Sequence, residues 1–352
     1  MFGLGKTKQV VGLDIGSSSV KAVELKRTGK GVDLVHLGVE TLPPEMVVDG
    51  AIVDAGAVTN AIVQLFTQHK IKTKTIATSV SGHSVIVKRL TMTGMNEADL
   101  HDAIQNEAAQ HIPFDIQEVH MDYQVLEGDE TTANMDVLLV AAKKDKVLNY
   151  TYVVSMANRT PSVVDIDAFA LQNCYEYNYE PEATTTVALL NIGASVMNIN
   201  LVRGATPMFV RDVSVGGNQY TDSLTKELDL TFDDAEKVKM GKSVAGVSDE
   251  ARLPVLKSVS EIILLEIQKT LDYFRSTSAG EHIEKIYVAG GSARVTGLLD
   301  LLKQEFSLGV EELNPFRRVN FNPAGAFGEL INENSPRLAV AVGLALRSFE
   351  NI

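Results

Sequence analysis

The two halves of the chain open with the same pattern of apolar and polar positions. In each half three short apolar runs follow one another, and the first run ends at a polar residue that is followed by small residues. These runs predict β-strands at 10–15, 19–25 and 32–40 in the first half, and at 184–192, 195–203 and 206–212 in the second half. The repetition predicts two related α/β domains.

Amphipathic stretches follow these strands. Apolar positions at helical spacing predict helices at 55–69, 218–229, 232–240, 252–276 and 295–306, and further strands are predicted at 75–80, 84–90 and 283–289. The stretch 336–347 carries small residues that allow close packing against another helix. The stretch 322–334 is rich in Gly, Asn and Pro and is expected to be loosely structured.

Residues 88–158 form a predicted α+β unit that is inserted into the first domain. Asn96 is the expected N-cap of a helix at 97–111. Strands at 119–126 and 135–142, a hairpin loop at 127–134 and a helix at 144–158 complete the unit. The unit offers a surface for a partner, and a purely structural insertion fits the same pattern.

Composition narrows the class of protein. With 352 residues, 45% hydrophobic and 22% charged, the chain is typical of a folded protein of two domains. A net charge of −13 disfavours nucleic acid and anionic lipid as direct partners, because both require a basic surface.

Neither a signal-peptide pattern nor a run of about 18 apolar residues is present, so a cytoplasmic location is expected. Cys174 is expected to be a small buried residue, and no metal-binding spacing of His or Cys is found.

The small-residue turn after each first strand is suited to a phosphate. Asp14 ends the first strand, and Gly16, Ser17 and Ser18 follow it with backbone N–H groups that can form an anion-binding nest. Gly193, Ala194 and Ser195 repeat this layout in the second half. The Asp14 carboxylate would then meet the phosphates through a hydrated Mg²⁺. An ordinary hairpin with a Gly-Ser turn is the alternative for either copy taken alone.

A third turn and a charged helix add candidate contacts. Gly290, Gly291 and Ser292 follow a buried strand and leave room for an adenosine or an α-phosphate, although a tight turn between strand and helix would look the same. Glu236 and Lys237 lie early on a predicted helix, where they either contact a base or ribose or form a solvated face.

Two further acids end the strand that precedes a helix near Ala168. Asp165 and Asp167 either orient water or Mg²⁺ or cap that helix, and the local pattern favours the cap. No Ser/His/Asp, Cys/His or paired-carboxylate spacing points to another kind of catalytic site.

Taken in order, five segments resemble the phosphate-1, connect-1, phosphate-2, adenosine and connect-2 motifs of the actin-like ATPase superfamily. They are 12–21, 165–171, 190–201, 286–298 and 339–346. The inserted unit, the segment 212–220 and the helix end at 105–114 are similar to the FtsA/PilM branch, and to PilM in particular. The resemblance implies the duplicated, ribonuclease H-like two-domain fold. Its expected parts are 1–87 and 159–183 for the first domain, 88–158 for the insertion, 184–335 for the second domain and 336–352 for a returning helix.

The resemblance also implies a function. PilM-like proteins are cytoplasmic ATP-binding scaffolds of the type IV pilus machine, held at the inner membrane by the cytoplasmic N-terminus of PilN, with a motor ATPase or platform protein as further partners. The implied ATP and Mg²⁺ site adds Ser19 and Lys21 to the three turns, with Asp14 and Asp165 as candidate catalytic residues. The resemblance does not determine whether the protein forms a homo-oligomer.

One residue departs from the superfamily pattern. Asn191 stands where the phosphate-2 segment usually has Asp, and an amide cannot carry charge for Mg²⁺ or act as a base. Slow or absent ATP hydrolysis is therefore expected. An FtsA-like filament-forming division protein and an actin-fold small-molecule kinase are the alternatives. Because the sequence ends just after the connect-2 segment, the amphipathic membrane helix of FtsA-like proteins is not expected here.

Overall fold

The first domain is built on a sheet that mixes antiparallel and parallel strands. A computed structural model describes residues 9–126, 134–278 and 281–349. The sheet has the order β10-β6-β1-β2-β3-β16. Its strands are β1 (Val11–Ile15), β2 (Ser19–Thr28), β3 (Gly31–Thr41), β6 (Thr75–Val80), β10 (Thr160–Ile166) and β16 (Val319–Asn320). A short hairpin of β4 (Val47–Val48) and β5 (Ala51–Ile52) lies between β3 and β6 in the chain.

The second sheet repeats the strand order of the first. Its order is β13-β12-β11-β14-β15, with β11 (Thr186–Ile192), β12 (Met197–Arg203), β13 (Thr206–Val213), β14 (Ile283–Ala289) and β15 (Gly309–Glu312). In both sheets the first strand pairs antiparallel with the second and parallel with the fourth. The predicted duplication into two related α/β domains is confirmed.

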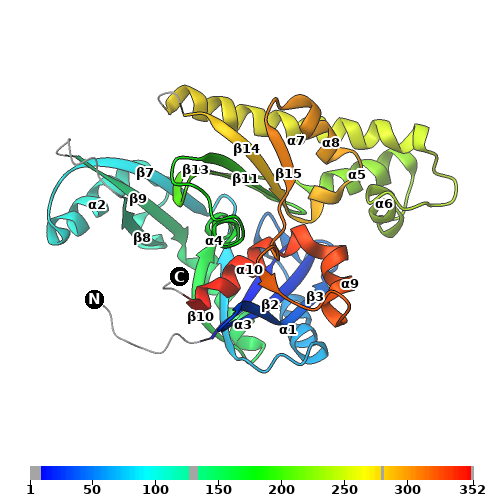
Figure 1. Cartoon of the computed structure of the whole chain (residues 1–352), viewed down its shortest axis with the longest axis horizontal. Helices are drawn as coiled ribbons and strands as arrows, with labels where there is room; N and C mark the ends of the chain where they lie inside the picture. Colours follow the sequence, from blue (N-terminus) through cyan, green and yellow to red (C-terminus); the bar gives the residue numbers. More distant parts are fainter. Residues whose placement is uncertain (1–8, 127–133, 279–280, 350–352) are drawn as a thin grey trace.

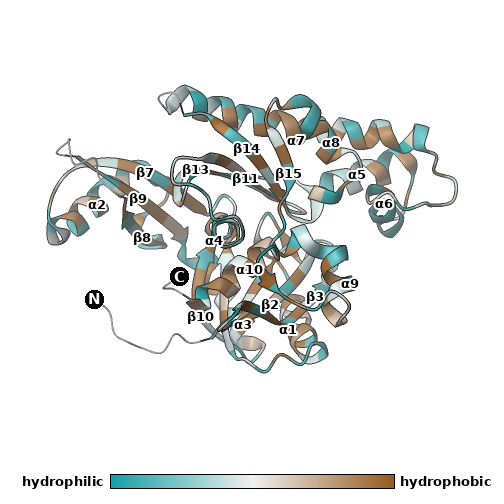
Figure 2. Cartoon of the chain, in the orientation of Figure 1, coloured by the Kyte–Doolittle hydropathy of each residue, from teal (hydrophilic) through white to brown (hydrophobic). Residues whose placement is uncertain are grey.

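Helices cover the outer faces of the sheets and fill the space between them (Figure 1). α1 (Ala55–Gln68) and α3 (Lys144–Met156) pack on the first sheet. α5 (Gly217–Leu228), α6 (Phe232–Lys239), α7 (Asp249–Thr277) and α8 (Leu298–Glu305) pack on the second. α4 (Asp167–Tyr179) and α10 (Ala339–Leu346) share one core with residues of both sheets. Figure 2 shows the apolar residues gathered in the strands, whereas α7 alternates between apolar and polar residues.

The inserted unit has a small core of its own. Its sheet has the order β7-β9-β8, formed by β7 (Val85–Thr93), β8 (Val119–Val125) and β9 (Asn134–Lys143), and α2 (Glu97–His111) packs on it. The side chain of Asn96 accepts a hydrogen bond from Asp99 N–H at 3.0 Å, as predicted for the N-cap. α3, which we assigned to this unit, packs instead against α1 and the first sheet. Most of the predicted hairpin loop lies outside the described residues.

One prediction near the C-terminal end is wrong, because the stretch expected to be loose contains α9 (Ala326–Asn334). The helix predicted at 295–306 is present as α8. It begins three residues later than predicted, after Gly297, whose φ of +84° is not helical and separates α8 from the preceding 3-10 helix η2 (Gly291–Arg294). No helix within the described ranges is long and apolar enough to cross a membrane.

Two glycines allow α10 to touch its neighbours backbone to backbone. A Cβ on Gly12 of β1 would overlap the carbonyl oxygen of Ala341, and a Cβ on Gly343 of α10 would overlap the carbonyl oxygen of Ala170 in α4. Because backbone atoms leave no side chain to rearrange, neither position has room for a larger residue.

Replacing Gly343 with Ala is therefore expected to destabilise the fold. Helix propensity favours Ala over Gly by about 1 kcal/mol, whereas displacing packed backbone costs about 1–3 kcal/mol or more. A Cβ on Gly343 would lie 1.7 Å from the Ala170 oxygen, so the upper end of this cost applies and we expect a net loss of about 2 kcal/mol in the free energy of unfolding, measured by urea denaturation. Gly29→Ala is the control, because among the described residues no atom beyond Gly29 and its two chain neighbours lies within 4 Å of its Cβ position. An unchanged or increased stability of Gly343→Ala would contradict the packing argument.

Candidate functional site

The three small-residue turns meet between the two domains. Ser17 Oγ of the first turn lies 2.5 Å from Ser195 Oγ of the second. Ser292 Oγ of the third turn donates a hydrogen bond to the carbonyl oxygen of Gly193 at 2.8 Å. The fold therefore brings together segments that lie far apart in the sequence, and it does so at the domain interface, where binding sites commonly form.

Both hairpins close with the same backbone hydrogen bond. Gly16 N–H donates to the carbonyl of Ser19 at 3.1 Å, and Gly193 N–H donates to that of Val196 at 2.9 Å. At Gly193 a Cβ would lie 2.7 Å from the Val196 oxygen, too close for any side chain. The turn of the second domain thus requires glycine for its own backbone.

The start of α5 packs against the second turn. A Cβ on Gly216 would lie 2.6 Å from the carbonyl oxygens of both Gly193 and Ala194, and Gly217 N–H donates to the Gly193 carbonyl at 2.9 Å. Sequence reasoning noted this Gly-Gly pair only as part of the family resemblance, because its role depends on a contact across the fold.

An acid and a cation neutralise one another beside the first turn. Asp14 on β1 and Lys21 on β2 are cross-strand neighbours, and Lys21 Nζ lies 2.8 Å from Asp14 Oδ2. Both side chains are buried and have little contact with water. Each charge is therefore stabilised by its partner instead of by hydration. The two predicted site residues therefore act as one unit.

Two further cations approach the turns, the half-buried Arg337 and the buried Lys239, and sequence reasoning missed both. Arg337, from the 3-10 helix η3 (Ser335–Leu338), donates to Ser19 Oγ at 2.7 Å, and its Cβ lies 3.9 Å from the Cβ position of Gly291. Its buried Nε has no hydrogen-bond partner in the described part of the chain. Lys239 donates to Thr221 Oγ1 at 2.9 Å. Burial lowers the pKa of the Arg337 and Lys239 side chains, because little water reaches their charges.

The predicted pair on α6 divides between two faces of the helix. Glu236 forms an ion pair with the buried Lys239 and accepts a hydrogen bond from Thr221. Lys237 lies on the exposed face, where it pairs with Asp234 at 2.8 Å. The structure therefore brings Glu236 toward the turns and does not bring Lys237 there; helical spacing would have selected Lys239 as the partner of Glu236.

Asp165 and Asp167 have different surroundings, and neither caps α4. The N-cap position is Ile166, and no side chain caps this helix end, so the cap interpretation is wrong. Asp165 Oδ2 lies 3.6 Å from Arg347 Nε and thus forms an ion pair with the C-terminal turn. Asp167 accepts a hydrogen bond from Ser79 Oγ at 2.5 Å and belongs to the cleft between the domains.

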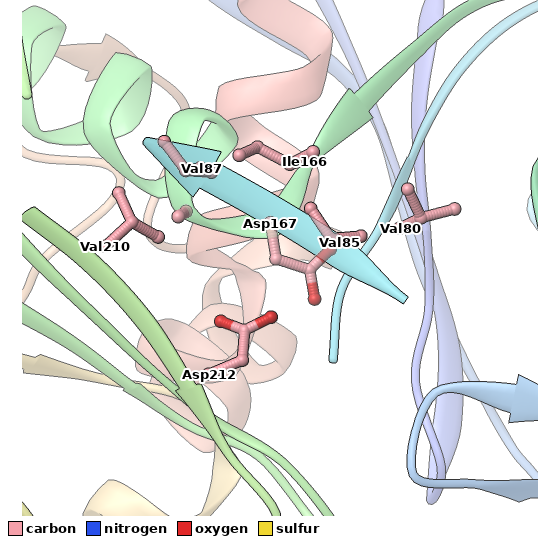
Figure 3. A pocket seen from close by; sticks show the side chains of 8 residues that line it. Val80, Val85, Val87, Ile166, Asp167, Val210 and Asp212 are labelled. Carbon is pink, nitrogen blue, oxygen red and sulfur yellow. The ribbon is translucent and has the colours of Figure 1, made fainter. Parts of the chain in front are cut away.

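Asp167 faces Asp212 of the second domain across a small cavity (Figure 3). The cavity has a volume of about 30 Å³, enough for a water molecule, and its other lining residues are Val80, Val85, Val87, Ile166, Ala168 and Val210. Burial, reinforced by the negative charge of Asp14, raises the pKa of Asp167 to about 6. A carboxyl group that is half ionised at about pH 6 can exchange a proton with a water molecule under mildly acidic conditions.

Replacing Asp167 with Asn is expected to change how stability depends on pH. Between pH 4 and pH 6 the folded protein holds the Asp167 proton more tightly than the unfolded chain, so stability falls as the pH rises through this window. A rise from 3.8 to about 6 corresponds to a loss of up to about 3 kcal/mol at pH 7. The amide of the Asp167→Asn variant carries no charge and still accepts the Ser79 hydrogen bond.

Relative to the wild type, Asp167→Asn should therefore gain stability between pH 4 and pH 7, by up to about 3 kcal/mol in urea denaturation. Asp300→Asn, which removes an exposed carboxylate, is the control. The same difference at both pH values would show that Asp167 does not titrate in this window.

Comparisons with known proteins agree with this architecture. The family model described as type IV pilus assembly protein PilM matches residues 12–349. A solved PilM-PilN type IV pilus biogenesis complex contains a chain that is 27% identical, with a TM-score of 0.84 over 97% of this chain and 98% of that one.

More distant structures share the fold. The ethanolamine utilization protein EutJ from Carboxydothermus hydrogenoformans is 14% identical, with a TM-score of 0.57 over 96% of this chain and 89% of that one. MreB5 of Spiroplasma citri bound to ADP is 15% identical, with a TM-score of 0.50 over 99% and 100%. The actin-like two-domain fold is thereby confirmed, and the chain belongs to the PilM family of type IV pilus assembly proteins.

Proposed function

We propose that this chain is an ATP-binding scaffold of the type IV pilus assembly machine. The observation that carries the proposal is the meeting of three small-residue turns with buried cations between two domains of an actin-like fold. A triphosphate is a flexible polyanion, and exposed backbone N–H groups together with Lys and Arg side chains are the groups that bind it.

The residues present fit ATP. The first and second turns, at Gly16–Ser18 and Gly193–Ser195, would hold the phosphates, with Ser19 and Lys21 beside them. Gly290, Gly291 and Ser292 would hold the adenosine, with Glu236 near the ribose. The Nε atom of Arg337 supports this assignment. It is a buried hydrogen-bond donor with no acceptor in the described part of the protein, and buried donors are normally hydrogen-bonded, so a bound ligand would supply the acceptor.

Mg²⁺ would be held mainly by the phosphates. Within the described residues no group of three or more His, Cys, Asp or Glu side chains could hold a metal ion, and the Asp14 carboxylate is shared with Lys21. Asp14 would then act through bound water, as is usual for Mg²⁺ at phosphate sites. Asn191 donates a hydrogen bond to Asn198 and carries no charge, which supports slow or absent hydrolysis.

Gly291→Val is expected to abolish ATP binding and leave the fold intact. Apart from Arg337 Cβ at 3.9 Å, no neighbouring atom lies within 4 Å of the Gly291 Cβ position, so the fold tolerates a side chain that would occupy the adenosine space. The Kd for ATP, measured by calorimetry, should rise at least about tenfold. Gly29→Val is the control at another open position. Wild-type affinity of Gly291→Val would show that adenosine binds elsewhere.

The partner of the scaffold is proposed to be the cytoplasmic N-terminus of PilN. The similar solved structure is described as a PilM-PilN complex, and the inserted unit has its own core and supplies none of the three turns. Membership of the PilM family favours this scaffold over the filament-forming and kinase alternatives. Val125 on β8 is an exposed apolar residue of the unit, 46% accessible, and is available for such a contact.

A peptide that copies the PilN cytoplasmic N-terminus is expected to bind the intact protein. Val125→Glu should weaken this binding at least about tenfold, because a buried charge without a partner costs more than about 1 kcal/mol. Leu265→Glu on α7 is the control, since this residue is equally exposed but belongs to the second domain. Fluorescence anisotropy measures both variants. Failure of the folded wild type to bind the peptide, with or without ATP, would overturn the scaffold function.

A further inference from the structure

A row of polar side chains crosses the second sheet beside the second turn. The strand register places Asn191 of β11 next to Asn198 of β12, and Asn198 next to Asp212 of β13. Asn191 Nδ2 donates to Asn198 Oδ1 at 2.8 Å, and Asn198 Nδ2 donates to Asp212 Oδ1 at 2.7 Å. The row begins two residues before Gly193, so it starts at the turn assigned to the phosphates.

The carboxylate at the end of the row determines the direction of every hydrogen bond in it. Both oxygens of Asp212 accept from N–H donors, one from Asn198 and one from the backbone of Gly82. Asn198 must therefore turn its NH₂ group toward Asp212 and its oxygen toward Asn191. Asn191 must in turn donate, which leaves its own oxygen outside the row. Asp212 on β13 thus determines that Asn191 contributes its NH₂ group to the row and not its oxygen.

The row also reaches the first domain. Gly82 N–H donates to Asp212 Oδ2 at 2.5 Å, and Ser214 Oγ lies 3.0 Å from His83 Nε2 next to it. Gly82 and His83 belong to the loop between β6 and β7, and β7 is the first strand of the inserted unit. The row therefore joins the second turn to the entrance of that unit.

The β6–β7 loop is held on its other side by the first domain. The ammonium group of Lys146 donates to the carbonyl oxygen of Ser81. Gly82 has a φ of +86°, and a Cβ there would lie 3.0 Å from the carbonyl oxygen of Asp49. A loop confined in this way has little freedom to deform, so a displacement of Asp212 is passed on to β7 instead of being absorbed.

We propose that Asp212 is a positioning residue that couples nucleotide binding to the inserted unit through the row Asn191–Asn198–Asp212. This inference rests on the proposed function and adds its regulation. Nucleotide at the second turn would fix Asn191, which holds Asn198 and through it Asp212; Asp212 then holds Gly82, and the orientation of β7 follows. Coupling free energies of this kind typically change a second affinity about 5- to 150-fold.

Asp212→Asn tests the proposal with almost no change in shape. An amide has a single acceptor oxygen, so it cannot accept from both Asn198 and Gly82 in the way the two carboxylate oxygens do. Hydrogen exchange of the Gly82 amide is measured with and without ATP in the full-length protein. We expect ATP to slow this exchange in the wild type about tenfold or more, and to have little effect in Asp212→Asn. ATP should also change the affinity for the PilN peptide in the wild type but not in the variant.

Two further variants separate the row from general stability. Asn198→Ala opens the row at its centre and leaves the contact of Asp212 with Gly82, so the Gly82 amide should remain protected but no longer respond to ATP. Glu281→Gln removes an acid of a contact within the second domain, the pair of Arg203 with Glu281 at 2.7 Å, and should behave like the wild type.

The outcomes distinguish this proposal from the scaffold function. If wild-type protein binds ATP without any change at the Gly82 amide, or if Asp212→Asn keeps the full response, the coupling role of Asp212 is overturned. If the wild type binds no PilN peptide, the scaffold function fails, whereas the exchange of the Gly82 amide still decides the role of Asp212.

Discussion

The backbone contact of α10 with β1 and α4 is the constraint on which the arrangement of the two domains depends. Because Gly12 and Gly343 lack a Cβ, α10 lies against the first sheet on one side and against α4 on the other. These two helices share a core with residues of both sheets. The position of α10 against β1 and α4 is therefore set by backbone atoms, which cannot adjust as side chains can, and the side chains of the shared core connect both helices to the second sheet.

Charge is distributed unevenly in this acidic protein. The chain has a net charge of −13, yet the buried Lys21 and Lys239 and the half-buried Arg337 lie around the three turns. The first two are paired with Asp14 and Glu236, so the site is close to neutral until an anion enters it. Arg337 keeps an unused donor within the described part of the chain. In the proposed ATP site, the acidic surroundings would favour a metal-bound polyanion over a bare one, because the metal offsets part of the phosphate charge.

Sequence patterns predicted the strands, most helices and the three turns, since these depend on local periodicity and on glycine. They did not locate Lys239 and Arg337, whose roles follow from how α6 and η3 face the turns. They also did not show that Asp165 and Asp167 lie in different surroundings. β10 ends between these two residues, so the alternation of side chains along a strand does not predict the direction of Asp167 from that of Asp165. Lys237 was predicted at the site and Lys239 was not considered; each position along a helix turns a side chain by about 100°, so Lys239, three residues after Glu236, shares its face and Lys237 does not.

The two halves of the duplication have diverged at equivalent positions. Asp14 and Lys21 form the cross-strand pair beside the first turn, and Asn191 and Asn198 form the corresponding pair beside the second. The first pair holds two opposite charges that neutralise each other where they stand. The second pair is neutral, so its orientation is set from outside, by the carboxylate of Asp212 on the next strand. A charged pair fixes its own geometry through Coulombic attraction, whereas an amide pair has two nearly equivalent orientations and follows whatever group lies at its end. One domain is thereby suited to hold charge and the other to respond to its neighbour, which is the asymmetry that the proposed coupling of a ligand site to the inserted unit requires.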